Sequence, residues 1–165
     1  MNDRSINLLV FLLISATFVI SAAAANSATF HDESFNAVPQ PTPVSEKPPY
    51  TGYKDVTIGM AAEIVRTKLG APKEKSDEQD SFVFSDHESA QVYYDSAKKV
   101  TAVTVTFTGK IDTAPTPAAV FGVDAEVNPD GGIFKMVRYP KAGFWISYNK
   151  IPGAEPMIMI ALQKI

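Results

Sequence analysis

The chain has 165 residues, with 15 basic against 18 acidic side chains and a formal charge of −3. Proteins that bind nucleic acid normally present a basic face, so this balance argues against that class. The sequence holds no cysteine and two histidines, which excludes disulfides, thiolate metal sites, three-histidine metal sites and a cysteine-linked lipid anchor. A hydrophobic share of 45% is sufficient for a folded core.

The first 25 residues have the three parts of an export signal. Arg4 is followed by an apolar run of about 13 residues, from Leu8 to Ile20, and then by the small residues Ala23-Ala24-Ala25. The run is shorter than the roughly 20 apolar residues that span a bilayer. We expect a signal peptide over residues 1–25 and export to the periplasm or out of the cell. An uncleaved membrane anchor is the alternative.

Residues 26–52 are rich in proline and show no periodicity. Pro39, Pro41 and Pro43 are followed by Pro48 and Pro49. Proline fixes φ and lacks an amide proton, so it favours extended, polyproline-like chain. We expect a flexible linker here.

From Asp55 onward the pattern becomes regular, beginning with a helix. Apolar Met60, Ile64, Val65 and Leu69 recur at helical spacing and predict one buried face. Gly70 then provides a normal helix stop.

Three strands are expected after this helix. Two are short and aromatic, at residues 81–84 and 91–94, and the third covers residues 100–108. In the third strand Val103, Val105 and Phe107 alternate with threonines, which is typical of an antiparallel sheet with one packed face and one wet face.

The second half of the chain repeats this order. A short helix is expected between Thr116, which can cap it, and Gly122, which can end it. Three pairs of segments are offset by 52 positions: Leu69-Gly70 with Phe121-Gly122, Phe82 with Phe134, and Val92–Tyr94 with Phe144–Ile146. We therefore expect an α+β fold of two tandem units, residues 53–110 and 111–165, each with one helix and a three-stranded antiparallel sheet. The units would share one curved sheet or a tight interface, because about 55 residues form a marginal core alone. A single irregular α+β domain is the alternative.

Residues 54–109 resemble the SmpA/OmlA (BamE) domain of outer-membrane assembly lipoproteins. The resemblance rests on Ile58-Gly59-Met60, on Val65, on Leu69-Gly70-Ala71-Pro72 and on Lys99–Val103. It implies a helical segment on a three-stranded sheet that binds partner proteins of the assembly machinery. Doubling of such a unit is similar to the beta-lactamase inhibitor protein architecture, in which a curved sheet grips an enzyme.

Chemistry-bearing residues are sparse. Asp86-His87-Glu88 is the clearest grouping of an imidazole with carboxylates, and an envelope hydrolase that uses His87 is one hypothesis. Residues adjacent in a turn between strands diverge, so a solvated hairpin tip is favoured. The acidic residues between Asp124 and Asp130 lack the ligand order of a calcium loop. We expect no catalytic residue, no cofactor and no metal, and therefore not an enzyme.

Candidate binding residues lie on the wet side of the expected strands. Trp145 alternates with the apolar set Phe144, Ile146 and Tyr148, so it shares the other side with polar neighbours. Tyrosine, tryptophan and arginine are common binding anchors, and methionine adapts its shape to a partner. The candidate set is Tyr93, Arg138, Trp145, Met157 and Met159. A buried Trp145 is the alternative. We expect an exported, non-catalytic protein-recognition module of the cell envelope; a secreted enzyme inhibitor or a small-ligand carrier is the alternative.

Overall fold

The computed structural model describes residues 47–165, which are mostly β-strand. The expected signal peptide, the linker up to residue 46 and His31 lie outside the described residues. The elements in chain order are β1 (Gly52–Tyr53), β2 (Val56–Thr57), α1 (Ala62–Leu69), β3 (Glu74–Lys75), β4 (Gln79–Ser85), β5 (Glu88–Tyr94), β6 (Val100–Thr108), α2 (Pro117–Phe121), β7 (Ile133–Tyr139), β8 (Phe144–Ile151) and β9 (Met157–Lys164).

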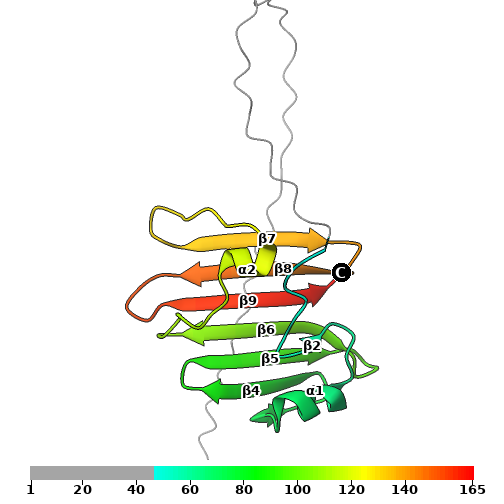
Figure 1. Ribbon diagram of the computed structural model, residues 1–165. Helices are drawn as coiled ribbons and strands as arrows, with labels where there is room; N and C mark the ends of the chain where they lie inside the picture. Colours follow the sequence, from blue (N-terminus) through cyan, green and yellow to red (C-terminus); the bar gives the residue numbers. More distant parts are fainter. Residues whose placement is uncertain (1–46) are drawn as a thin grey trace, which may run out of the picture. The chain divides into compact units, whose positions relative to one another are not determined.

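Seven of the strands form one antiparallel sheet with the order β3-β4-β5-β6-β9-β8-β7 (Figure 1). Strands β6 and β9 are neighbours near its middle although about 50 residues separate them in the chain. The β6–β9 ladder joins Val103 to Leu162 and Val105 to Ile160, all fully buried. The most regular apolar alternation in the sequence therefore lies at the centre of the sheet.

One face of this sheet, here called the covered face, carries the core. Helices α1 and α2 and the small β1–β2 hairpin all lie on this side (Figure 1). The covered face presents Phe82, Val92 and Ile146, each at most 2% exposed, toward them. Burial of such β-branched and aromatic side chains stabilises by roughly 1.5–3 kcal/mol each.

Helix α1 is anchored to the sheet by a buried carboxylate. Asp80 of β4 is fully buried and accepts from Arg66 Nε at 2.8 Å, from Arg66 Nη2 at 3.1 Å and from the Tyr94 hydroxyl at 2.8 Å. Val65 is also fully buried, but Ile64 is 50% exposed. The expectation that Ile64 belongs to the buried face is wrong, because the contact made by this eight-residue helix centres on Ala62 and Val65.

Helix α2 was predicted correctly at both ends. Thr116 Oγ1 accepts from the Ala119 amide at 3.2 Å, and Pro117 occupies the first turn. Gly122 ends the helix with φ of 77°, in the left-handed region that favours glycine. This short helix buries Val120 and Phe121 against the covered face.

The expected fold class, two α+β units of one helix and three strands each, is wrong. The described chain is mostly β, with nine strands in two sheets and two helices of eight and five residues. Strands β4, β5 and β6 lie where they were expected, but the interval between strands does not determine how much helix accompanies them. Much of the covering layer is hairpin and irregular chain in place of helix.

The 52-residue offset fails at the level of sheet faces for one of its pairs. Phe82 is 2% exposed on the covered face, whereas Phe134, its expected counterpart, is 66% exposed on the opposite face. A shift of one residue turns a strand side chain to the other face, so these two phenylalanines are not structurally equivalent.

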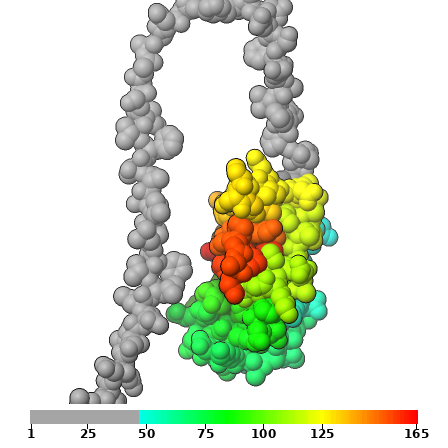
Figure 2. Space-filling view, turned by 90° about the vertical axis from the view of Figure 1, so that its left-hand side faces the viewer, coloured from blue at the N-terminus to red at the C-terminus, as the bar shows by residue number. Residues whose placement is uncertain are grey.

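The strand ends carry long surface connections. Figure 2 shows this side, with the α2–β7 connection in yellow and the β8–β9 turn in orange. Among the helices that the structure describes, none is long and apolar enough to cross a membrane.

Candidate protein-binding face

The second face of the sheet, here called the open face, consists of the side chains that alternate with the core. Its positions follow from the register, which aligns Tyr93 with Ala102, Gln163, Trp145 and Arg138 in one row across five strands. No described helix packs on this row, because both helices lie on the covered face (Figure 1). Among residues 47–165, the open face is therefore a broad surface that no helix covers.

Apolar side chains gather on one half of the open face, over β7, β8 and β9. Exposed fractions are 66% for Phe134, 53% for Met136 and 43% for Ile151, and Trp145, Met157 and Met159 are partly buried. Cross-strand pairing places Met157 opposite Ile151, and Met159 opposite Asn149, which in turn faces Phe134. We call the six apolar residues the apolar patch: Phe134, Met136, Trp145, Ile151, Met157 and Met159. A contiguous exposed patch of this kind on a soluble domain usually marks an interface.

Arg138 supplies the charge of this surface. It lies directly opposite Trp145 in the β7–β8 ladder, where facing side chains are close enough to interact. Along the open-face positions of β4–β9, Arg138 is the single charged residue. The apolar patch thus has one cation at its edge and no carboxylate within it.

The structure brings four of the five predicted binding residues together. Arg138, Trp145, Met157 and Met159 occupy the adjacent strands β7, β8 and β9. Tyr93 shares the row of Trp145 but lies three strands away, roughly 14 Å at the usual strand spacing. Tyr93 is therefore outside the apolar patch, and its hydroxyl donates to Gln91 at 2.8 Å.

Sequence reasoning missed the three most exposed members of the patch, Phe134, Met136 and Ile151. Strand β7 reads Ile-Phe-Lys-Met-Val-Arg-Tyr, so apolar residues occur at both parities and the alternation does not identify the outer face. The register with β8 decides the outer face, because the pairing of Arg138 with Trp145 places Phe134 and Met136 on the same side as the tryptophan.

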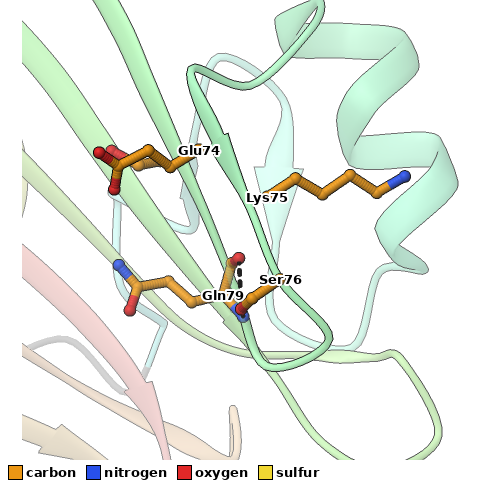
Figure 3. Close-up of a pocket in the computed structure, with 5 residues that line it drawn as sticks. Glu74, Lys75, Ser76 and Gln79 are labelled. Carbon is orange, nitrogen blue, oxygen red and sulfur yellow. Dashed lines mark hydrogen bonds between the residues drawn. The ribbon is translucent and has the colours of Figure 1, made fainter.

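The other half of the open face, over β3–β6, is mostly polar, although Val83 of β4 is also exposed there. Threonines 104 and 106 face outward from β6 as the alternation predicted, beside Gln91 and Ser89 of β5. A hollow of about 330 Å³ at the β3–β4 turn is lined by Glu74, Lys75, Ser76, Gln79 and Ser81. Figure 3 shows Glu74 and Gln79 on one side of it and Lys75 pointing toward α1. Hydrogen bonds between Ser76 and Gln79 close this turn, so the hollow belongs to the turn and not to the apolar patch.

The grouping around His87 does not form an acid–base pair in the described chain. His87 Nδ1 lies 2.9 Å from the Thr108 carbonyl, which makes Nδ1 the donor. Glu88 turns to the covered face, where it accepts from the Tyr53 hydroxyl and lies 3.2 Å from Lys54 Nζ. The imidazole and the carboxylate therefore have separate partners. No group of three or more potential metal ligands occurs among residues 47–165.

Tyrosines with raised pKa values belong to the covered face. Burial, with a smaller contribution from Glu88, raises the pKa of Tyr50 to about 12. Burial and the hydrogen bond to Asp80 raise the pKa of Tyr94. Each hydroxyl is neutral at physiological pH, so neither group supplies a base to the open face.

Comparisons with protein-family models, with curated proteins and with solved structures find no match to this chain. The resemblance of residues 54–109 to the SmpA/OmlA domain stays a prediction from the sequence.

Proposed function

We propose that this protein is an exported, non-catalytic recognition module of the cell envelope whose open face binds another protein. The observation that carries the proposal is the apolar patch: six apolar side chains on one flat surface, with Phe134 and Met136 more than half exposed. Exposed apolar area costs free energy in water, and a partner that covers it recovers roughly 25 cal/mol per Å².

The chemistry of the patch describes its partner. Tryptophan and arginine side by side are common anchors of protein interfaces, and the two methionines of β9 can adapt to an uneven surface. Because Arg138 has no carboxylate beside it on the open face, the matching surface is apolar with an acidic residue at its rim. The amino-terminal export signal and the SmpA/OmlA resemblance favour an envelope protein as this partner.

A pull-down of partners from envelope extracts tests the proposal with three variants. Trp145→Ala and Met159→Ala each remove a patch residue that is already partly exposed, so the fold should persist and the partner should be lost. Ile64→Ala is the matched control, because Ile64 is 50% exposed but lies on α1 of the covered side. The proposal fails if the two patch variants retain the same partner as the wild type, or if Ile64→Ala loses it equally.

A further inference from the structure

The two edges of the seven-stranded sheet differ strongly. One edge, β3, has two residues, Glu74 and Lys75, which are exposed and charged. Short charged edges are a common protection against pairing with another chain. The other edge, β7, runs over seven residues from Ile133 to Tyr139, and no described strand lies beyond it (Figure 1). The α2–β7 connection reaches the outer side of this edge just before β7, where the Asn128 amide donates to the Gly132 carbonyl at 2.8 Å. Strand β7 is thus a long, largely apolar edge.

The register fixes which backbone groups of β7 are free. Gly143 and Ile165 lie opposite each other at the end of the β8–β9 ladder, and the Ile165 amide donates to the Gly143 carbonyl at 3.0 Å. Because hydrogen-bonded pairs alternate along an antiparallel ladder, the backbone groups of odd-numbered β8 residues bond to β9 and those of even-numbered residues bond to β7. Their partners on β7 are the odd-numbered residues. Phe134, Met136 and Arg138 therefore turn their amide and carbonyl groups outward. Their side chains are the ones exposed on the open face.

We propose that β7 pairs with β7 of a second copy of this chain, antiparallel and about a two-fold axis at Met136. In this register Met136 faces Met136 of the second copy, and Phe134 faces Arg138 of the second copy. All three outward residues of each strand then exchange both backbone hydrogen bonds. The two neighbouring registers are less favourable. A two-fold axis at Lys135 would place the two Lys135 side chains opposite each other, and an axis at Val137 would leave Phe134 without a partner residue in the other strand.

The spacing of the charges on β7 is compatible with a second copy as the occupant. Strand β7 carries two cations and no acid, yet the register about Met136 sets Lys135 opposite Val137 and Arg138 opposite Phe134, so no cation faces a cation. The two-fold axis is perpendicular to the sheet, so the open faces of both copies lie on the same side. The pairing therefore places Phe134 and Met136 beside side chains of the second copy and merges the two apolar patches into one surface. This inference goes beyond the proposed function and does not depend on it.

Single cysteines test the register, since the chain has none of its own. In a hydrogen-bonded pair the Cα atoms are about 5.5 Å apart, within disulfide range, so Met136→Cys should give a disulfide-linked dimer on mild oxidation. Phe134→Cys should not, because the two copies of residue 134 would be roughly 13 Å apart along the strands. Val83→Cys is the matched surface control, since Val83 and Met136 are each 53% exposed on the open face.

The measurements use the full chain in a mild detergent that keeps the apolar stretch of residues 8–20 from associating. Light scattering should give twice the mass of the chain, and Met136→Pro should halve it with an unchanged circular dichroism spectrum. Proline at position 136 removes an outward amide and no bond to β8. A monomeric wild type overturns the proposal, as does equal crosslinking of the three cysteine variants. If Met136→Pro does not fold, the cysteine series decides alone. A partner pull-down that fails while Met136→Cys crosslinks would refute the proposed function and leave this pairing intact.

Discussion

At the scale of single residues, Asp80 determines how α1 sits on the sheet. Its carboxylate is fully buried and has three hydrogen bonds, two from Arg66 and one from Tyr94. A buried charge without such partners would strongly destabilise the fold. Each donor to Asp80 therefore contributes more to the free energy of unfolding than the same hydrogen bond would at a solvated site. Tyr139 offers the opposite case, because its buried hydroxyl has no hydrogen-bond partner within residues 47–165.

Tyr94→Phe and Tyr139→Phe form a matched pair of substitutions. Tyr94→Phe removes a donor to a buried carboxylate and should lower the free energy of unfolding by about 1.5–3 kcal/mol. Tyr139→Phe removes an unsatisfied hydroxyl and should leave that free energy unchanged or slightly raised. Urea unfolding followed by circular dichroism measures both. Equal effects of the two variants would contradict the assignment of Tyr94 as a partner of Asp80.

At the scale of elements, local signals predicted what depends on local chemistry. The caps of α2 at Thr116 and Gly122 and the alternation of β6 were visible in the sequence, because capping and alternation need no distant partner. The outward face of β7 was not visible, since its register with β8 decides which of its apolar residues are exposed. The fold class was mispredicted for the same reason: evenly spaced strands do not reveal how little helix covers them.

Thr116→Ala tests the cap of α2. The substitution removes the acceptor of the Ala119 amide and should cost about 1 kcal/mol of unfolding free energy. Thr113→Ala, an exposed threonine three residues earlier, should change that free energy by less than about 0.5 kcal/mol. Urea unfolding compares the two, and a Thr116 variant as stable as the Thr113 variant would mean that the cap contributes nothing.

At the scale of the whole molecule, one sheet separates two tasks. Its covered face holds the core, the helices and the tyrosines with raised pKa values, whereas its open face holds the apolar patch and Arg138. The candidate residues lie on the face that strand parity indicated, and their role in binding stays a prediction. No property of the sequence alone placed Tyr93 three strands from Trp145. Because loss of an open-face side chain leaves the core intact, binding and stability should be separable.

Photo-crosslinking in intact cells tests this separation most directly. A photoreactive amino acid in place of Met159 on the open face should form an adduct with a partner protein, and Trp145→Ala in the same chain should weaken the adduct. The same amino acid in place of the half-exposed Ile64 on α1 should form none. Adducts of equal yield at both positions, or an adduct at Ile64 alone, would contradict the claim that the open face binds the partner.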